Sequence, residues 1–202
     1  MTRFAGRLAY VATPHYCLPG CLGPRYLSLI LVREEAPAHC LYELKGARVA
    51  VNSRDSQSGY NCLRHSVAPM ACGKPFFSGV LVTGSHADSA MAVGAGRADV
   101  AAVDCVTHGL LARYRPECLA GTRVLGHTAS APALPYVTRA GMPAETLEAL
   151  RLALFQVAAA PALAPVTEAL GLCGFTVLPA GAYEEILTME QSAQRLGYPQ
   201  LH

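Results

Sequence analysis

The fold class follows from the sequence RVAVNSRDSQSGYNCL at residues 48–63. It opens with the apolar, β-branched run of a buried strand, and a polar cluster ends that strand. A helix follows from about Gly59, because apolar residues then recur at the spacing of one helical face, at Tyr60, Leu63 and Val67. The stretch therefore predicts a strand, a turn and a helix in succession, which is the repeating unit of α/β proteins.

The same alternation continues on both sides of this stretch. Further strands are expected at Leu8–Ala12, Leu27–Val32, Gly79–Thr83, Asp99–Asp104 and Thr122–Leu125. Helices are expected at about 85–93, 106–113, 147–157, 163–170 and 183–193. Ser85 and Asp88 have the spacing of a capping box at the start of the first of these helices. Strands that alternate with helices predict an α/β architecture with a largely parallel sheet.

The composition is that of a folded, globular chain. Of 202 residues, 52% are hydrophobic and 15% are charged, which supplies a core and excludes a disordered protein. The formal net charge is only +2 and no run of Lys or Arg occurs, so nucleic acid is not expected as a partner. No apolar run approaches the roughly 18 residues that a membrane span requires.

Two features bear on the compartment. The apolar stretch Leu8–Ala12 is shorter than the core of a signal peptide, which predicts a chain without an export signal. The eight cysteines are scattered, and a chain this apolar does not need disulfide bonds for stability. We therefore expect reduced, mostly buried thiols, as in a cytosolic protein.

The strongest candidate for a binding site is the turn that follows the strand at residues 48–52. A turn between a strand and a helix directs several free backbone N–H groups at one place, and the helix dipole adds partial positive charge there. Ser56 and Ser58 add hydroxyl donors, and Gly59 allows a ligand to approach the backbone closely. These residues predict a site for a tetrahedral oxyanion. The alternative is that Ser56 or Ser58 only caps the helix.

Two further strand ends carry polar residues. Ser85 and His86 follow one strand, and Asp104 ends the next. Because strand ends meet where α/β proteins bind ligands, His86 is a candidate donor to the same anion, and Asp104 a candidate contact for a cationic or hydroxyl part of the ligand. The alternatives are an ordinary surface histidine and a helix cap. Three polar strand ends together are better evidence for a site than any one of them.

Metal, cofactor and nucleophile chemistry have little support. His15 with Cys17 and Cys21, and Cys105 with His108, lack the paired spacing of a structural zinc site, so no metal is expected. No nucleophile elbow, Walker loop or dinucleotide fingerprint follows a strand. Neither a cofactor nor a catalytic residue is therefore assigned.

An ordered series of short motifs runs from about Thr13 to the C-terminus. Its members are Leu44-Lys45-Gly46, Ser56–Asn61, Gly84-Ser85-His86 with Ser89, Val93 with Gly96 and Asp99, and Ala101–Asp104. This series resembles the phosphate/phosphite/phosphonate-binding family, the substrate-binding components of phosphonate-type ABC transporters. The resemblance implies the type 2 periplasmic binding protein fold, in which two lobes close around a ligand.

The resemblance also implies a role for each candidate residue. In that family a Ser-x-Ser-Gly turn holds the phosphonate oxygens, a histidine touches the same anion, an acidic residue faces the rest of the ligand, and an aromatic wall comes from the other lobe. The implied ligand-binding residues are Tyr16, Ser56, Gln57, Ser58, Gly59, Ser85, His86 and Asp104.

The lobes are expected to be unequal. Family members begin with a further strand–helix–strand–helix segment before the part that matches Thr13, so the resemblance implies an incomplete first lobe, built from residues 1–49 and 129–202. Residues 50–128 form the second lobe, which carries the anion-binding turn. The proline-rich segment Ala131–Pro135 is expected to cross between the lobes. An incomplete lobe would expose sheet edges and apolar surface, which predicts a homo-oligomer.

The sequence thus predicts a binding protein for a small oxyanion, such as phosphate, phosphonate or a related phosphorylated compound, that works with an ABC permease. Two alternatives stay open. One is an intracellular enzyme of cofactor biosynthesis on the same fold, with His86 and Asp104 as acid and base. The other is a sensor or partner-binding module that has lost transport. The family is periplasmic, and the lack of a signal peptide predicts a cytoplasmic protein or an N-terminally truncated periplasmic one.

Overall fold

The computed structural model describes residues 6–202, and the chain forms two compact units. Unit 1 contains the chain up to Tyr26 together with Ala131–Glu185, and unit 2 contains Leu27–Ser130 together with Ile186–His202. The boundaries therefore differ from the expected ones, because residues 27–49 and 186–202 fold with the second unit and not the first. Residues 1–5 of the expected first lobe lie outside the described residues.

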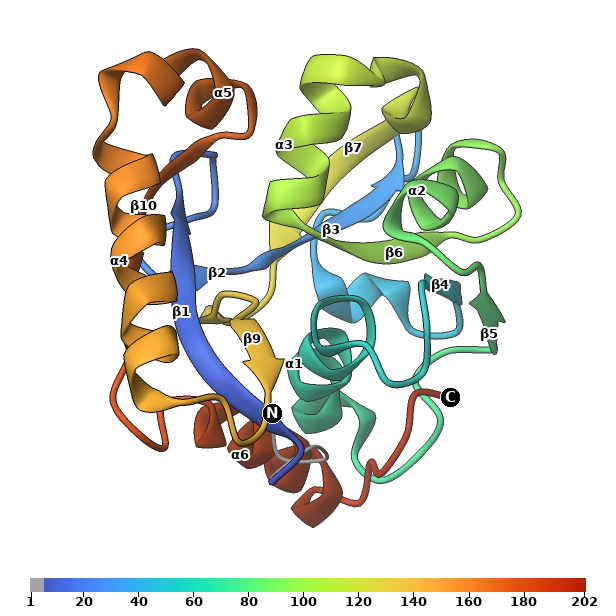
Figure 1. The fold of residues 1–202 in the computed structure, drawn as a ribbon. Helices are drawn as coiled ribbons and strands as arrows, with labels where there is room; N and C mark the ends of the chain where they lie inside the picture. Colours follow the sequence, from blue (N-terminus) through green and yellow to red (C-terminus); the bar gives the residue numbers. More distant parts are fainter. Residues whose placement is uncertain (1–5) are drawn as a thin grey trace. The chain divides into compact units, whose positions relative to one another are not determined.

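Unit 2 is built on a five-stranded sheet with the order β5-β4-β6-β3-β7 (Figure 1). Its strands are β3 (Ser28–Arg33), β4 (Arg48–Val51), β5 (Gly79–Val82), β6 (Val100–Asp104) and β7 (Thr122–His127). β4 runs parallel to β5 and β6, whereas β3 runs antiparallel to β6 and β7. The residues of β6 are all buried, as expected for a strand covered on both faces.

The prediction of mostly parallel sheets is wrong. Within residues 6–202, only the pairs β4 with β5 and β4 with β6, which are joined through helices, are parallel. β3 inserts between β6 and β7 in the opposite direction, which no local pattern in Ser28–Arg33 indicates. Its central residues Ile30–Val32 are all buried, and such a run fits either direction.

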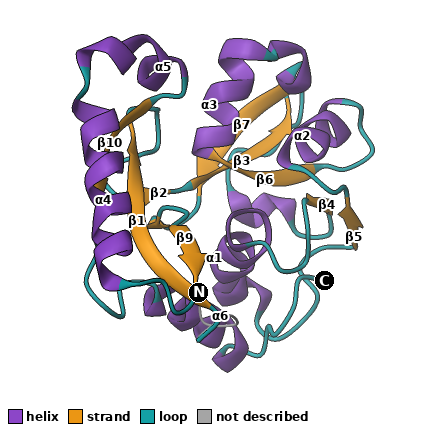
Figure 2. Cartoon of the chain, in the orientation of Figure 1, coloured by secondary structure: helices purple, strands orange, loops and turns teal. Residues whose placement is uncertain are grey.

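Three helices follow the parallel strands of unit 2 (Figure 2). They are α1 (Cys62–Ala71), α2 (His86–Gly94) and α3 (Cys105–Tyr114). A π-helical turn, η3 (Gln57–Asn61), leads into α1, and short 3-10 turns occur at Leu41–Leu44 and Pro116–Leu119. The apolar face of α1 packs against β3 and β4 in one core, with Leu63, Val67, Val49 and Val51 fully buried.

The last residues of the described chain complete this core. Tyr198 is fully buried and Leu201 is 2% exposed in the same cluster as α1. The backbone N–H of Leu201 donates to the hydroxyl of Tyr60 at 3.0 Å, and the N–H groups of Phe76 and Phe77 donate to the carbonyl of His202. Unit 2 therefore depends on two segments that are distant in the sequence.

Unit 1 contains a three-stranded antiparallel sheet with β1 (Leu8–Tyr16) at its centre, between β9 (Tyr136–Arg139) and β10 (Leu172–Thr176). The short strands β2 (Arg25–Tyr26) and β8 (Ala131–Pro132) pair with each other, and β8 lies in the predicted extended segment. Helix α4 (Ala144–Ala159) packs on β1 and β10, where Leu147 and Leu154 reach the cluster around Phe175. A 3-10 turn at Pro161–Leu163 leads into α5 (Ala164–Ala169).

The remaining helix, α6 (Glu184–Arg195), begins in unit 1 and continues in unit 2. In unit 1, Arg25 forms a two-pronged ion pair with Glu185, with N–O distances of 2.7 and 2.9 Å. Further along, Met189 and Ala193 are buried in unit 2. The chain therefore passes between units three times, near residues 26, 130 and 185.

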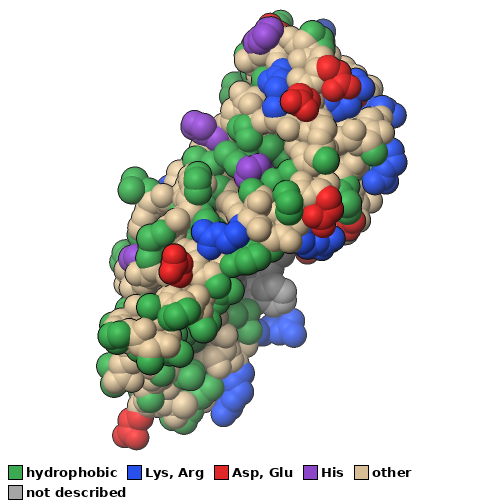
Figure 3. All heavy atoms as spheres, turned by 90° about the horizontal axis from the view of Figure 1, so that it is seen from above, with side chains coloured by type: hydrophobic (Ala, Val, Ile, Leu, Met, Phe, Trp, Pro, Cys, Tyr) green, Lys and Arg blue, Asp and Glu red, His purple; other side chains and the backbone are tan. Residues whose placement is uncertain are grey.

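Helices α4 and α5 expose much apolar surface. No residue of α4 is buried. The apolar side chains exposed on these helices, on the turn between them and at the C-cap of α5 are Leu150, Leu152, Phe155, Val157, Leu163, Val166 and Leu170. Apolar side chains are also numerous on the face drawn in Figure 3. Within residues 6–202, no single helix is long and apolar enough to cross a membrane. Only the helices at 144–159 and 161–169 taken together have the length and composition of a membrane span, and they are bent by 72° with respect to each other.

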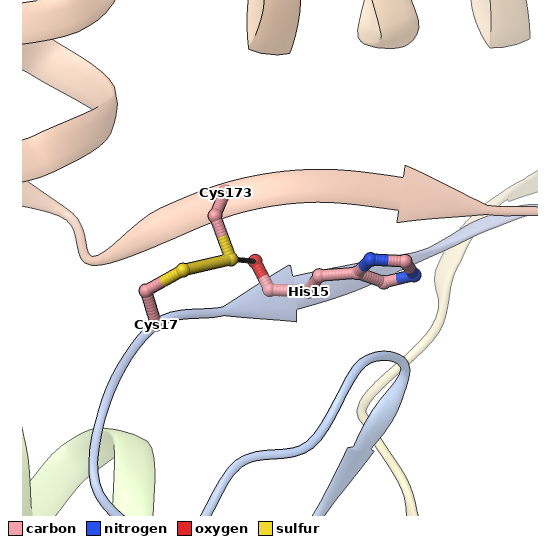
Figure 4. Close-up of a disulfide and its surroundings, with 3 residues drawn as sticks. All are labelled: His15, Cys17 and Cys173. Atoms are coloured by element: carbon pink, nitrogen blue, oxygen red, sulfur yellow. Dashed lines mark hydrogen bonds between the residues drawn. A yellow bond between two sulfur atoms is a disulfide. The ribbon is translucent and has the colours of Figure 1, made fainter.

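A disulfide joins the two segments of unit 1 (Figure 4). Cys17 follows β1 and Cys173 lies in β10, with their Cα atoms 5.9 Å apart. The sulfur of Cys173 lies 3.5 Å from the carbonyl oxygen of His15. The expectation of reduced thiols throughout is therefore wrong for this pair, because the antiparallel pairing of β1 with β10 brings two distant cysteines together. Cys62, Cys105 and Cys118 are buried thiols outside this disulfide, whereas Cys40 and Cys72 are exposed thiols.

Candidate functional site

The candidate site begins at the turn that opens the first long helix of unit 2. Ser56 caps this helix, because its side chain accepts a hydrogen bond from the backbone N–H of Gly59 at 3.0 Å. Its carbonyl accepts from the N–H of Asn61, also at 3.0 Å. In the described part of the chain, the N–H groups of Gln57 and Ser58 donate to no carbonyl, so the turn presents two amides at the positive end of the helix.

Ser58 does not cap the helix, because its hydroxyl is directed toward His86. Its Oγ lies 2.9 Å from Nε2 of His86, within hydrogen-bond distance. Its backbone carbonyl is held in turn by the hydroxyl of Ser28, at the start of β3, at 2.9 Å. Ser58 is 6% exposed, so this arrangement is fixed inside unit 2. Strand β3 therefore sets the position of the turn, although it lies far from it in the sequence.

His86 lies between Ser58 and a carboxylate. Nε2 of His86 is 3.3 Å from Oδ2 of Asp104, and the two side chains are 11% and 7% exposed. Asp104 is also the N-cap of α3, since its Oδ1 accepts from the N–H of Thr107 at 2.8 Å and its Oδ2 from the Thr107 hydroxyl at 2.5 Å. Asp104 therefore caps a helix and also faces the same imidazole nitrogen as Ser58, while its contact with a ligand stays a prediction.

The electrostatics of the histidine depend on its burial. Burial lowers the pKa of His86, and the negative charge of Asp104 and the backbone carbonyl of Ala102 oppose that effect. Burial likewise lowers the pKa of His108, on the first turns of α3, and Asp104 again acts in the opposite direction. A negative ligand beside His86 would favour the charged imidazole, so binding of an anion and uptake of a proton are linked at this position.

Gly59 allows the close packing of the turn. A Cβ atom on this residue would lie 2.1 Å from Oδ1 of Asn52 and 3.0 Å from Cε1 of His86. No side chain fits there without displacing groups of the site. The glycine therefore lets β4, the turn and α2 meet at one point.

Gln57 and Ser85 use their side chains within the protein. The amide oxygen of Gln57 accepts from Asn61 at 2.6 Å, and its amide nitrogen lies near the sulfur atoms of Cys62 and Met189. The hydroxyl of Ser85 accepts from the N–H of Asp88 at 3.0 Å and donates to its carboxylate at 2.7 Å, so Ser85 is the predicted cap of this helix. The backbone of Gln57 is thus what this residue offers to an anion.

Tyr16 lies at the end of β1 in unit 1, half-buried against the cluster that contains Val11 and Phe175. Its assignment as an aromatic wall of the site stays a prediction. The structure brings together Ser56, Ser58, Gly59, His86 and Asp104 in unit 2, with the backbone of Gln57 and Ser85 at the flanking helix starts.

Three further residues that shape the site have no role predicted from the sequence. Asn52 directly follows β4 and lies beside Gly59. The hydroxyl of Ser28 donates to the carbonyl of Ser58, and Thr107 donates two hydrogen bonds to the Asp104 carboxylate. The Asp-x-x-Thr spacing at 104–107 is a helix-start signal that could have indicated Thr107. Nothing local singles out Ser28, because its partner lies 30 positions along the chain. Across residues 6–202, no cluster of three His, Cys, Asp or Glu side chains could hold a metal ion.

Comparison with known proteins identifies the family. The sequence profile of the periplasmic substrate-binding proteins of phosphonate ABC transporters matches residues 19–183, most of the chain. The chain belongs to this family. Its members are binding proteins of the periplasm. No curated protein sequence matches the chain.

Several solved structures share the fold of this chain. A binding-protein component of an ABC phosphonate transporter from Pseudomonas aeruginosa has a TM-score of 0.78 and 22% identity, over 96% of this chain and 65% of that one. PhnD1 from Prochlorococcus marinus, in complex with methylphosphonate, has a TM-score of 0.75 and 13% identity, over 94% of this chain and 72% of that one. XAC2383 from Xanthomonas citri, bound to ATP, has a TM-score of 0.71 and 22% identity, over 96% and 74%. The α/β fold is that of type 2 periplasmic binding proteins.

Proposed function

We propose that this protein binds a small oxyanion, phosphate, phosphonate or a related phosphorylated compound, at the turn Ser56–Gly59, and delivers it to an ABC permease. The observation that carries the proposal is the grouping of two backbone amides, the Ser58 hydroxyl and the His86 imidazole at one helix start. Donors of this kind at the positive end of a helix suit a tetrahedral anion. Family membership supports the same function.

Asp104 narrows the ligand class. A carboxylate 3.3 Å from Nε2 of His86 would repel a fully ionised anion, unless the ligand carries a proton or a positive group to face it. A phosphonate or phosphate that keeps one proton can donate that proton to Asp104. Sulfate has no such proton near neutral pH, so we expect it to bind more weakly than the phosphorus oxyanions.

The test is a thermal-shift titration with methylphosphonate, inorganic phosphate, ATP and sulfate. A ligand that binds only the folded protein raises the melting temperature with concentration. Ser58→Ala should reduce the shift, because it removes a hydroxyl from the anion site, with a loss of about tenfold in affinity for about 1.4 kcal/mol. Ser66→Ala is the matched control, since Ser66 lies on α1 and its hydroxyl donates to the Cys62 carbonyl.

Equal shifts in wild type and Ser58→Ala would remove Ser58 from the site. No shift with any of the four anions in the wild-type protein would overturn the proposed function. Weaker binding in Ser66→Ala than in Ser58→Ala would indicate a general effect on the helix and not a contact with the ligand.

The geometry favours binding over the alternative of an enzyme. In a Ser-His-Asp hydrolase, the serine and the carboxylate lie on opposite nitrogens of the imidazole. Here Ser58 and Asp104 both face Nε2, and Nδ1 has no hydrogen-bond partner among the described residues. A proton relay therefore has no path through the ring. Recovery of unchanged methylphosphonate or ATP after incubation would agree with a binding protein, whereas a product would establish an enzyme.

We infer that the protein works in an oxidising compartment, as its family does. The support is the disulfide between Cys17 and Cys173, since disulfides persist in the periplasm and are rare in the cytosol. This inference replaces the expected cytosolic chemistry of the cysteines. We also infer that α4 and α5 mediate self-association, because of the apolar side chains they expose.

A further inference from the structure

The turn that opens α1 is tied to the rest of unit 2 by one buried side chain. Asn61 is 9% exposed, and its amide nitrogen donates to the side-chain oxygen of Gln57 at 2.6 Å and to the carbonyl of Ile186 at 3.3 Å. Its amide oxygen accepts from the guanidinium of Arg64 at 2.8 Å. Both N–H groups and the oxygen are therefore engaged, each with a different partner.

The partners of this amide determine its orientation. The guanidinium of Arg64 only donates hydrogen bonds, so it faces the oxygen of Asn61. The carbonyl of Ile186 only accepts, so it faces the nitrogen. Exchanging the two amide atoms would place donor against donor and acceptor against acceptor at a buried position, where each lost hydrogen bond is destabilising. The side chain therefore has one arrangement, and this arrangement attaches the turn to Ile186.

One partner of Asn61 belongs to the candidate site. The backbone N–H of Gln57 is one of the two amides that the turn presents to an anion. The backbone N–H of Asn61 closes the same turn on the carbonyl of Ser56 at 3.0 Å, in the π-helical pattern that is frequent at functional sites. Asn61 thus holds the turn twice, through its backbone and through the side chain of Gln57. An adjustment of the turn around an anion therefore acts on the Asn61 side chain.

Another partner of Asn61 lies where the chain enters unit 2. Ile186 is the first residue of the C-terminal segment of unit 2, and Glu185 before it is the last residue of unit 1. In unit 1 the Glu185 carboxylate pairs with Arg25 on β2, and β2 pairs with β8. Because β2 ends at Tyr26 and β8 begins at Ala131, the three crossings of the chain start from one connected group in unit 1. The position of Ile186 is therefore linked to all three crossings.

We propose that Asn61 is a positioning residue that couples the anion-binding turn to the chain crossing at residues 185–186. Through it, the arrangement of Gln57 around a ligand and the position of the start of α6 in unit 2 depend on each other. The proposal rests on the proposed function of this turn. A ligand that fixes the turn then also restricts the start of α6. Because coupling between binding equilibria is reciprocal, the restriction of α6 raises the affinity of the turn by the same factor.

The test is hydrogen exchange of the full chain with and without methylphosphonate, measured by mass spectrometry at short exchange times, where local opening dominates. In the wild-type protein the ligand should slow exchange at residues 56–61 and also at residues 186–190. Asn61→Asp replaces the donating nitrogen by an oxygen, so it loses the bonds to Gln57 and Ile186 but keeps the pairing with Arg64. In this variant, saturating methylphosphonate should slow exchange at residues 56–61 alone. The affinity should fall about fivefold or more, as is common for coupled sites.

Two variants of Gln57 separate the hydrogen bond from the added charge. Gln57→Glu places a carboxylate in the turn, but an oxygen still accepts from Asn61, so saturating ligand should still protect residues 186–190 although the affinity falls. It also removes the amide nitrogen that lies 3.4 Å from the sulfur of Met189, so protection that persists does not depend on that contact. Gln57→Met removes the acceptor without adding charge. It should therefore lose the protection of residues 186–190, as Asn61→Asp does.

The location of the protection distinguishes the possible failures. Ligand protection at residues 186–190 that persists in Asn61→Asp and in Gln57→Met would overturn the coupling, and so would wild-type protection confined to residues 56–61. A wild-type protein in which methylphosphonate protects neither segment would refute the proposed function of the turn, and the coupling with it. If Asn61→Asp does not fold, Gln57→Met decides alone. It leaves Asn61 bonded to Arg64 and Ile186.

Discussion

At the scale of single residues, Gly59 has the least freedom to change. Its missing side chain is where the amide of Asn52 and the ring of His86 come together. We expect Gly59→Ala to destabilise the protein by about 1–3 kcal/mol through overpacking, and to abolish anion binding by moving both groups. Urea unfolding and a methylphosphonate titration measure the two effects.

Two variants make this prediction specific. Gly79→Ala is the control, because a Cβ at Gly79 meets no atom within 4 Å. Asn52→Ala combined with Gly59→Ala removes the nearest atom in the clash and should restore part of the stability. If Gly59→Ala and Gly79→Ala have the same free energy of unfolding, the turn accommodates the added Cβ without strain, and the prediction is wrong.

His86 should make stability depend on pH. Burial lowers its pKa in the folded protein, so the unfolded chain binds the proton more readily. The contribution of His86 is fully present above its ordinary pKa of about 6.5 and is lost as pH falls through the lower folded value. Thermal unfolding between about pH 5 and 8 should show this loss.

The comparison protein for that series is His86→Gln, which has no titrating ring. Its melting temperature should fall less steeply toward acid than that of the wild type. His108 has a lowered pKa for the same reason, so part of the slope will stay in this variant. Identical slopes in the two proteins would contradict a buried, neutral His86.

Residue identities were the most predictable part of the site. Ser56, Ser58, His86 and Asp104 follow strand ends, and this position in the chain marks them without any structure. The separate roles of Ser56 and Ser58 could not be predicted, because serine caps a helix equally well at either position. The structure shows that Ser56 accepts from the N–H of Gly59, whereas Ser58 faces His86. Asn52 was missed because its role depends on a glycine seven positions later.

At the scale of elements, the helices and the strands of unit 2 follow from local patterns, whereas their directions do not. Apolar periodicity marks β4, β6 and α1 within a few residues of their observed bounds. The antiparallel placement of β3 comes from contacts with β6 and β7, which lie about 70 to 100 positions away. In unit 1, β10 was missed because Leu172–Thr176 is short and follows a helix without a polar break.

The disulfide should stabilise unit 1. It links residues 156 positions apart, so it restricts the unfolded chain strongly and should contribute about 2–5 kcal/mol. We expect a reducing agent to lower the melting temperature of unit 1. Replacing Cys17 and Cys173 together by Ser should produce the same loss and make the protein insensitive to the reductant.

Cys40→Ser serves as the control for this experiment, because Cys40 is exposed and free. Its melting temperature should match the wild type under both redox conditions. Equal melting temperatures with and without reductant in the wild-type protein would show that the bond adds nothing to stability. Thiol counting in the unfolded protein would then show whether Cys17 and Cys173 are bonded at all.

At the scale of the whole molecule, the exposed apolar side chains of α4 and α5 predict self-association. Monomeric soluble proteins rarely expose connected apolar patches larger than a few hundred Å². Leu152 is 57% exposed and Val166 is 55% exposed. We expect a dimer at concentrations of about tens of micromolar, as interfaces between identical chains commonly form. Sedimentation velocity measures it directly.

Charged replacements locate the interface. Leu152→Glu with Val166→Glu should shift the protein to monomer, because a buried unpaired carboxylate opposes association. Leu22→Glu, at an even more exposed apolar position of unit 1, should leave the dimer intact. A wild-type protein that sediments as a monomer throughout this range would refute self-association.

The path of the chain between the units has a consequence for biosynthesis. The core around α1 is closed by Tyr198 and Leu201, and the hydroxyl of Tyr60 receives the N–H of Leu201. These residues leave the ribosome only after all of Ala131–Glu185, the second segment of unit 1. Helix α1, which supports the candidate site, therefore stays incompletely covered while the second segment of unit 1 is being synthesised. Ribosome-bound intermediates that end before Tyr198 should consequently be vulnerable to proteases at α1.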